Sequence, residues 1–282
     1  MDRMNRMDEE VDIERTPPSE ELLRECACLY SGHYGTWAVA TPEGGTNTIG
    51  HRVRTTSSLL RRLYLPQNTA FLVTARTRAC SSVRHGERVL VGYACVQGFR
   101  VDPPLSYAAV WITQLVVKTE HRRRGIATRI CRSAIDREGS GSGESASASV
   151  ACIASSNPYS VRALEVAAGS RCCARFIREW YHVCASSSGV PYLRGRPFHS
   201  AHCTVDTAFY VDSSELTENE SVRRLDEAGK WSHPHRRTEP LPLGHEYVAL
   251  VRTSYGRGGI DASKDALFRY QNQSNNDADG QK

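Results

Sequence analysis

The sequence predicts an α/β (α+β) fold in which a mixed central sheet carries helices on both faces. Residues 109–117 form an apolar run rich in Val and Ile, with the length and the β-branched content of a buried strand. A polar turn follows, and from Ile126 apolar or small residues recur at helical spacing, at Ile130, Ala134 and Ile135. A second strand and helix come directly afterwards. Two successive strand-helix units predict neighbouring parallel strands joined by a right-handed crossover.

The N-terminal part predicts a strand, two helices and an antiparallel strand pair. A short strand is expected at 11–15, and Pro17-Pro18-Ser19 followed by two glutamates marks the start of a helix. Residues 57–65 predict a second helix, which a proline closes. Strands at 69–74 and 88–99 flank a polar, Gly-containing segment, and this spacing favours antiparallel pairing.

The second strand-helix unit carries clear boundary signals. Residues 150–154 read as a short buried strand after the Gly/Ser-rich segment 137–149, which we expect to be flexible. Asn157 is a natural N-cap, Pro158 suits the first helical position, and Gly169 suits the end of the helix. The helix is therefore expected to run to about residue 168.

The chain from about residue 171 is predicted to elaborate the same single domain, which spans 11–255. Residues 176–184 fit either a helix or a strand. The remaining expectations are strands at 191–196, 207–211 and 246–251, a polar helix at 216–227 and a loop at 229–242. We expect residues 1–10 to be a disordered tail and 256–282 to be poorly ordered, because both lack patterning.

Composition describes an ordinary globular chain. The 282 residues are 40% hydrophobic and 24% charged, with a net charge of +5 and no long basic stripe, so a dedicated nucleic-acid binder is disfavoured. The N-terminus has no apolar signal region and no stretch approaches the length of a membrane span. The ten cysteines include no C-x-x-C and several sit in apolar segments, which favours buried thiols over a zinc site. We expect a cytoplasmic or nuclear protein.

An anion-binding site is predicted where the helix starting at Ile126 begins. The first turn of a helix presents unpaired N–H groups and the positive end of the helix dipole, so it suits a phosphate. Gly125 leaves room for an anion to approach the backbone, and Ala127 keeps the next turn small. Arg122, Arg123 and Arg124 add fixed positive charge at the same place. A basic surface turn with no ligand is the alternative.

These residues resemble a known family. The pattern Arg122-x-x-Gly125-x-Ala127, after a strand that reads Gln114-Leu115-Val116-Val117, resembles the acyl-CoA pyrophosphate loop of the GNAT superfamily of N-acetyltransferases. The likeness spans strand, loop and helix. The wider frame of residues 111–117, with His33-Tyr34-Gly35 upstream, is similar to a fungal group of GNAT-like proteins.

The resemblance implies the GNAT fold, with a splayed parallel strand pair, and transfer of an acyl group, acetyl above all, from acyl-CoA to an amine. It implies that N–H groups of residues 123–128 hold the pyrophosphate and that the pantetheine arm lies along 115–117. The implied cofactor-binding residues are Leu115, Val116, Val117, Arg122, Arg123, Arg124, Gly125, Ile126, Ala127, Thr128 and Asn157. No metal is implied.

The catalytic groups are less clearly marked. Many GNAT enzymes protonate the leaving sulfur with a tyrosine several residues beyond an asparagine; here Asn157 matches the asparagine, but the tyrosine position reads Leu164 and the usual Gly-Phe ending reads Gly169-Ser170. Tyr159 is therefore the candidate acid, with packing at a helix start as the alternative.

Spacing alone selects no general base. Glu120 is our candidate, and the alternatives are His121, His199, His202 and Asp206. His121 is interpreted as a solvated loop residue and His33 as a hydrogen-bonded structural residue. The pairs His199/His202 and His233/His235 lack a third ligand, which disfavours metal binding. The aromatic turn at 33–37 either lines a substrate groove or packs beneath the sheet.

The sequence is compatible with two functions of different classes. One is an acyl-CoA-dependent N-acyltransferase with an amine acceptor. The other is a catalytically weak or inactive GNAT-fold module that binds CoA or a protein partner, as the missing tyrosine allows. A nucleic-acid binder that uses the arginine turn is the weakest alternative, and it would lose affinity steeply with salt.

Overall fold

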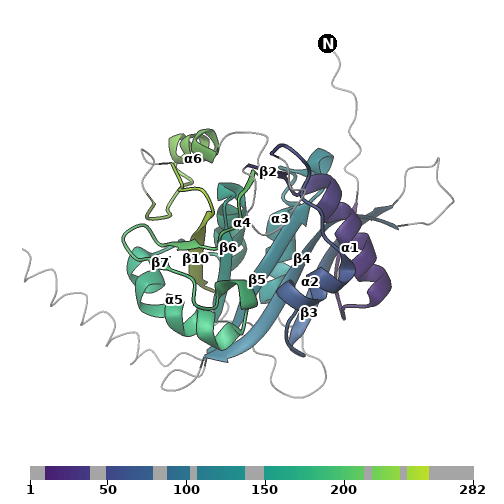
Figure 1. Cartoon of the computed structure of the whole chain (residues 1–282), viewed down its shortest axis with the longest axis horizontal. Coiled ribbons are helices and arrows are strands. Elements are labelled where there is room, and N and C mark those ends of the chain that lie inside the picture. Colours follow the sequence, from purple (N-terminus) through teal and green to yellow (C-terminus); the bar gives the residue numbers. More distant parts are fainter. Residues whose placement is uncertain are drawn as a thin grey trace, which may run out of the picture.

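A mixed eight-stranded sheet forms the centre of the computed structural model, which describes residues 10–38, 49–78, 88–101, 107–136, 149–212, 218–235 and 240–253. Its strands, in their order across the sheet, are β1 (Val11–Thr16), β3 (Ala70–Arg78), β4 (Arg88–Val101), β5 (Tyr107–Val117), β6 (Val150–Ser155), β10 (His245–Arg252), β8 (Thr204–Asp206) and β7 (Phe198–His199). Neighbours pair antiparallel except β5 and β6, which are parallel. Figure 1 shows this sheet running through the molecule.

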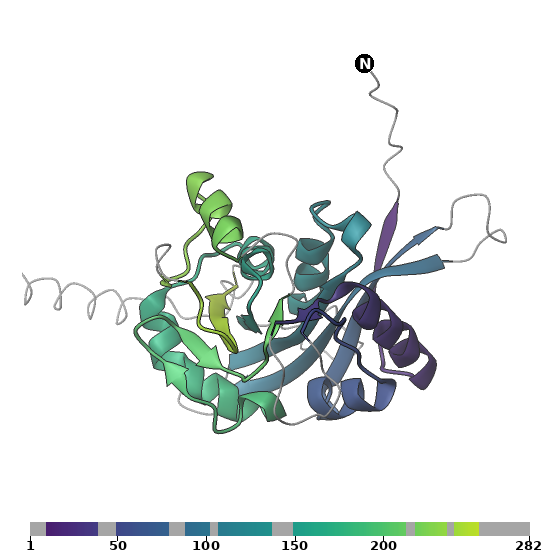
Figure 2. The same cartoon turned by 45° about the horizontal axis from the view of Figure 1, so that its top comes forward.

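Helices cover both faces of the sheet, as the sequence predicts. One face carries α1 (Glu20–His33), α2 (Ser57–Tyr64) and α5 (Ala174–Ser188), and the other carries α3 (Ile126–Ile135) and α4 (Pro158–Ala168) (Figure 2). The side chains of β4 and β5 show the division. A Cβ on Gly92 would lie 3.2 Å from Ile130 of α3, whereas Trp111 meets Tyr181 of α5 with ring centroids 6.5 Å apart. The short helix α6 (Glu218–Glu227) packs on α4.

The helices start where their capping residues predict. The side chains of Ser19 and Thr56 accept hydrogen bonds from the backbone N–H groups of Leu22 and Leu59, and Asn157 accepts one from Tyr159. The predicted inner face of α3, Ile126, Ile130, Ala134 and Ile135, is almost completely buried. Capping residues and apolar spacing in the sequence therefore mark where these helices start and which face they bury.

The parallel pair β5 and β6 separates part-way along its length. The two strands pair only from Ala109–Val150 to Ile112–Ile153, yet β5 continues to Val117. The separation begins at Thr113, an extra residue in the ladder between β4 and β5, because Cys95 opposes Gln114 while Val96 opposes Ile112. Such a bulge bends the strand and increases its twist. It turns the end of β5 away from β6 and opens a cleft between them.

A short two-stranded ladder crosses between the two halves of the molecule. β2 (Thr36–Trp37), which follows α1, pairs antiparallel with β9 (Val211–Asp212), which follows β8. The N–H of Ala38 also donates to the carbonyl of Tyr210, 3.0 Å away. We call residues 36–38 and 210–212 the strap, because they tie the chain after α1 to the chain before α6.

Two strands predicted in the C-terminal part are absent, and residues 176–184, which fitted either a helix or a strand, are helical. Residues 176–184 belong to the helix α5. Residues 191–196 begin with the 3₁₀ turn η2 (Pro191–Leu193) and form no strand, since Pro191 lacks an N–H for a ladder. Of residues 207–211 only Val211 is in a strand. Ala208 has a φ of 55°, and its N–H donates to the Asp206 carboxylate, so the chain turns there.

Other predictions hold for the described residues. The polar helix at 216–227 is present as α6, and the last strand is β10. The nine described cysteines are free, and all except Cys28 and Cys173 are buried. Within the described ranges no helix combines the length and the apolar content that a bilayer crossing requires. The predicted tails, apart from Glu10, and most of the Gly/Ser-rich segment, 137–148, lie outside the described residues.

Candidate functional site

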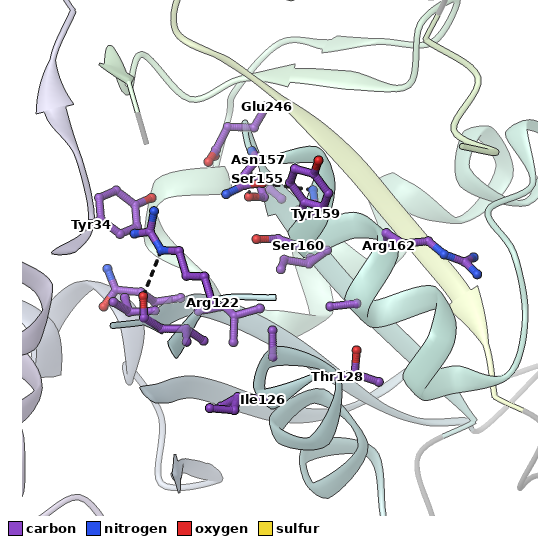
Figure 3. A pocket seen from close by; sticks show the side chains of 18 of the residues that line it. Tyr34, Arg122, Ile126, Thr128, Ser155, Asn157, Tyr159, Ser160, Arg162 and Glu246 are labelled. Atoms are coloured by element: carbon purple, nitrogen blue, oxygen red, sulfur yellow. Dashed lines mark hydrogen bonds between the residues drawn. The ribbon is translucent and has the colours of Figure 1, made fainter. Parts of the chain in front are cut away.

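A cleft of about 540 Å³ opens where β5 and β6 separate. Its walls come from the ends of β5 and β6, the first turns of α3 and α4, and the start of β10, and the segments on either side of the strap close one end. Figure 3 shows Glu246 of β10, Asn157 and Tyr159 at the start of α4, and Arg122 in the turn before α3 on the walls of this cleft. The turn and helix start at which the sequence predicts an anion site, residues 122–128, line this cleft except for Arg124.

The first turn of α3 presents free backbone N–H groups to the cleft. Gly125, at the N-cap position, has a φ of 76°, so its backbone is in the left-handed region that glycine adopts without strain. Within the described residues, the N–H groups of Gly125, Ile126, Ala127 and Thr128 meet no hydrogen-bond acceptor, and no side chain caps the helix. A Cβ on Gly125 would meet nothing within 4 Å. The helix start is therefore open, and its dipole favours an anion there.

The three arginines before α3 have different environments. Arg122 donates to the carbonyl of Val117, 3.1 Å away, and to the carbonyl of His33, so it fixes the end of β5 to the end of α1. Arg123 lines the cleft and lies over the ring of Tyr159, 5.8 Å from its centroid. Arg124 is exposed and does not line the cleft. Arg123 is thus the arginine best placed to meet a ligand phosphate.

The end of β5 supplies a strand edge. Leu115, Val116 and Val117 pair with β4 on one side, but β6 has left the ladder on the other. All three residues line the cleft. An extended chain placed along this edge could form strand-type hydrogen bonds with the backbone of β5. The pantetheine arm is predicted to lie along this edge.

Asn157 and Tyr159 both line the cleft, at the start of α4. The Asn157 carboxamide oxygen accepts the N–H of Tyr159 at 2.9 Å, so this side chain shapes the helix start. The hydroxyl of Ser155 accepts the N–H of Asn157 at 3.1 Å and fixes the turn from β6 into α4. Leu164, at the position where the family carries a tyrosine, is fully buried in the core and does not reach the cleft.

Glu246 is a candidate functional residue that the sequence-based prediction missed. It lies on β10, is only 6% exposed, and lines the cleft. Burial raises the pKa of its carboxyl to about 7, and a hydrogen bond from Thr207 opposes that rise. A carboxyl that titrates near neutral pH inside a cleft suits proton transfer. One signal was available in the sequence: an apolar and aromatic run, 247–251, follows Glu246 directly, and an acidic residue is seldom buried without a purpose.

Aromatic rings surround the space beside Glu246. Tyr34, Tyr64, Tyr192 and Phe209 line the cleft there, and we call these rings together with Glu246 the aromatic chamber. Tyr64 and Tyr192 lie 5.8 Å apart, and Tyr34 and Phe209 lie 5.9 Å apart, between ring centroids. The hydroxyl of Tyr192 donates to the carbonyl of Thr113 at the bulge, 3.2 Å away. Burial first, and then the nearby Glu246 carboxylate, raise the pKa of Tyr34 and of Tyr192 well above the ordinary value.

The aromatic turn predicted at 33–37 contributes directly to the site. His33 and Tyr34 line the cleft, while Tyr34 and Trp37 also pack against the apolar cluster between α1 and the sheet, so the turn does both. His33 also has the structural bond we expected, because its Nδ1 accepts the N–H of Thr119 at 3.3 Å. Burial lowers the pKa of His33, an effect that outweighs the opposing pull of the Glu120 carboxylate.

The other candidate bases are placed differently from one another. Glu120 lies in the 3₁₀ turn η1 (Thr119–His121), is exposed, and pairs with Lys118 at 2.8 Å outside the lining of the cleft. The interpretation of His121 as a solvated residue is wrong, because His121 is 9% exposed and lines the cleft. His199, His202 and Asp206 do not line it.

The histidines of the C-terminal part form ring pairs. The rings of His199 and His245 lie 4.8 Å apart, and those of His202 and His235 lie 5.6 Å apart, between centroids. Burial lowers the pKa of His233 to about 3, so that ring is neutral, and it bonds the carbonyl of Val248 at 3.0 Å. Among the residues that the structure describes, no three His, Cys, Asp or Glu side chains gather in a way that could hold a metal.

An open mixed sheet with one splayed parallel pair, and an anion-accepting helix start at the splay, is the architecture of an acyltransferase fold of the α/β class. Comparison with protein families gives the same result. The model of the acetyltransferase (GNAT) family matches residues 54–168, which include β5, α3, β6 and α4. These residues form a GNAT acetyltransferase domain, and the chain has the GNAT fold.

Several solved structures match part of the chain, with low sequence identities and low TM-scores. The ribosomal-protein-alanine N-acetyltransferase of Brucella melitensis biovar Abortus 2308 is 18% identical, with 45% of this chain and 72% of that chain covered and a TM-score of 0.29. The diaminobutyrate acetyltransferase EctA of Paenibacillus lautus, in complex with its substrate and coenzyme A, is 15% identical, with coverages of 57% and 74% and a TM-score of 0.30. The NatC complex bound to Gag peptide and CoA is 14% identical, with 51% of this chain and 74% of that chain covered and a TM-score of 0.30. No curated protein matches the sequence.

Proposed function

We propose that this protein is an acyl-CoA-dependent N-acyltransferase that transfers an acyl group, acetyl in the simplest case, to an amine, with Glu246 as the general base. The observation that carries the proposal is the position of Glu246. A buried carboxyl with a raised pKa shares one cleft with the open helix start of α3 and the free edge of β5.

The residues of the cleft fit acetyl-CoA as co-substrate. The free N–H groups of residues 125–128, with Arg123 beside them, suit a diphosphate, and the edge of β5 at 115–117 suits the amide-bearing pantetheine arm. When bound, acetyl-CoA supplies an activated thioester. The backbone of β5 would then hold the acyl group near Glu246, and positioning of this kind accounts for a large part of such catalysis.

The chain's own residues would move two protons. The Glu246 carboxylate accepts one from the ammonium of the acceptor, so that the free amine can attack the acyl carbon; a C–N bond forms and the C–S bond breaks. The leaving thiolate takes a proton, and Tyr159 stays our candidate donor. Arg123, 5.8 Å from its ring, would stabilise the transient phenolate, which regains a proton when the new amide nitrogen loses its own.

A variant pair tests the assignment of the base. In Glu246→Gln we expect kcat to fall by roughly 10² to 10⁴, the range for loss of general base catalysis. In the unmodified protein kcat should rise with pH through about 7, because Glu246 acts in its deprotonated form, and Glu246→Gln should lose this rise. Glu120→Gln, which changes the exposed carboxyl, should keep the rise of kcat with pH. If kcat of Glu246→Gln still rises through pH 7, the assignment of the base is refuted.

A CoA-binding module without catalysis is the second candidate. It is favoured by Leu164, whose buried side chain leaves the second turn of α4 without the proton donor that the family uses. Titration calorimetry with acetyl-CoA, followed by a thiol-release assay on a panel of amines, separates the two. Binding without turnover of any amine would favour the module.

A further inference from the structure

The aromatic chamber holds one carboxyl group, that of Glu246, which pairs with an ammonium in its ionised form. Among the described residues that line the cleft, Glu246 is the only carboxylate, and the permanent cations of the lining, Arg122, Arg123, Arg162 and Lys230, come from the loop before α3, from α4 and from the chain after α6. Around Glu246 the lining consists of Tyr and Phe rings and of neutral polar side chains, among them Thr113, Thr207, Ser155 and Asn157. The faces of such rings attract an ammonium group, and the carboxylate pairs with it.

This charge balance limits the acceptor. One ammonium is neutralised by Glu246, but a second ammonium in the same buried chamber would have no carboxylate to meet among the described lining residues, and an unpaired buried charge is costly. The ring faces instead favour an apolar body attached to the amine. The chamber therefore matches a monocation with a hydrophobic remainder and disfavours a polyamine.

The strap packs against residues that line the chamber on the side of α1. Trp37 of the strap packs edge-on against Phe209, 5.9 Å between centroids, and Tyr34 and Phe209 on either side of it line the chamber. The strap also contacts the residue before β10. Gly244, with a φ of 80°, lies so close to Tyr210 that a Cβ there would come within 2.7 Å of its ring. A polypeptide lying across this end of the cleft would have to displace both contacts.

We infer that the acceptor is a small, unattached monoamine with an apolar aromatic or aliphatic body, held by the aromatic chamber and Glu246, rather than a polyamine or a lysine of a polypeptide. The inference rests on the proposed function, since it assigns the acceptor of that reaction.

Steady-state kinetics with acetyl-CoA and four acceptor types tests it. The probes are phenethylamine, hexylamine, spermidine and a lysine-containing peptide with a blocked N-terminus. We expect kcat/KM for the two monoamines to exceed that for spermidine and the peptide by about tenfold or more, the size of one cation–π contact combined with an unpaired charge. A preference for spermidine or for the peptide would overturn the inference while leaving the proposed function intact.

Binding to the protein saturated with CoA, which has no acyl group to transfer, provides a readout independent of turnover. Phenethylamine should bind at least about tenfold more tightly than 2-phenylethanol, its neutral counterpart, and Glu246→Gln should remove that difference. Preferential binding of monoamines without any turnover would count against the proposed function and for the inference. If the monoamines bind no better than spermidine or the alcohol, the inference fails.

A matched aromatic substitution controls for loss of packing. Phe209→Leu, inside the chamber, should weaken phenethylamine binding, whereas Phe176→Leu removes a ring of α5 that packs on Trp180 and does not line the cleft. Equal effects of the two variants on phenethylamine affinity would show that the chamber rings do not hold the acceptor.

Discussion

Glu246, the proposed general base, reduces the stability of the fold above pH 4.5. Its folded pKa, about 7, lies above the value of 4.5 for an unperturbed carboxyl. The folded state therefore holds this proton more tightly than the unfolded chain does. By linkage, the contribution of Glu246 to stability is unaffected below pH 4.5 and becomes increasingly unfavourable as the pH rises from about 4.5 to 7.

Replacement by glutamine removes this pH-dependent cost. At pH 8 we expect Glu246→Gln to be more stable than the unmodified protein by a few kcal/mol, because each pKa unit corresponds to about 1.4 kcal/mol, and at pH 4 the difference should largely vanish. Urea unfolding at the two pH values measures it. A variant that is equally stable at pH 8 would mean that the carboxyl is not desolvated as the structure places it.

The start of α3 is the element on which binding depends. Leucine at position 125 would project into the space beside the free N–H groups of 126–128, where the structure has no protein atom within 4 Å of a Cβ. We expect Gly125→Leu to weaken acetyl-CoA binding by roughly a hundredfold or more, since the anion loses its place at the helix start. Calorimetry gives the affinity directly.

Gly195 provides the control for backbone strain. It has a φ of 69° and an exposed position, and a Cβ there would meet no atom within 4 Å, but it does not line the cleft. Gly195→Leu should therefore lose about 1–2 kcal/mol of stability, as Gly125→Leu does, and retain acetyl-CoA affinity. Retained affinity in Gly125→Leu would contradict the assignment of the anion site.

Most elements could be predicted from the sequence, because local signals define them. Ser19, Thr56 and Asn157 mark helix starts, and the spacing of Ile126, Ile130 and Ala134 marks a buried helical face. The short elements after residue 171 could not. There the chain turns at Ala208 and at Pro191 for reasons of side-chain hydrogen bonding and ring geometry that hydrophobic periodicity does not record.

One part of the candidate site could also be predicted from the sequence, and the other could not. Its anion end is continuous in sequence, so β5 and the first turn of α3 could be predicted from one motif. Its acceptor end is assembled from Tyr34, Tyr64, Tyr192 and Glu246, which come from four separate parts of the chain. The role of Glu246 depends on burial, which only the complete sheet creates, and the exposed Glu120 that the motif suggested lies outside the cleft lining.

On the scale of the whole molecule, the sheet consists of two halves, which are joined by the short pairing of β5 with β6. Strands β1, β3, β4 and β5 form one half, and β6, β10, β8 and β7 form the other. In the described part of the chain, the strand ladders that connect the halves are four residue pairs between β5 and β6 and the two pairs of the strap. A ligand arm that bonds the free edge of β5 would add to this connection, and binding to the folded state alone stabilises it.

Amide hydrogen exchange along β5 can detect a ligand arm that bonds to the free edge of this strand. We expect saturating acetyl-CoA to slow exchange at 113–117, where β6 has left the ladder, and at 125–128 by roughly tenfold or more, since bound amides no longer open to water. Residues 109–112, already paired with strands on both sides, serve as the internal control and should change little. Adenosine 5′-diphosphate, which carries the diphosphate but lacks the pantetheine arm, should protect 125–128 alone. Uniform protection along β5, or protection of 113–117 by the diphosphate, would show that the arm does not lie along this edge.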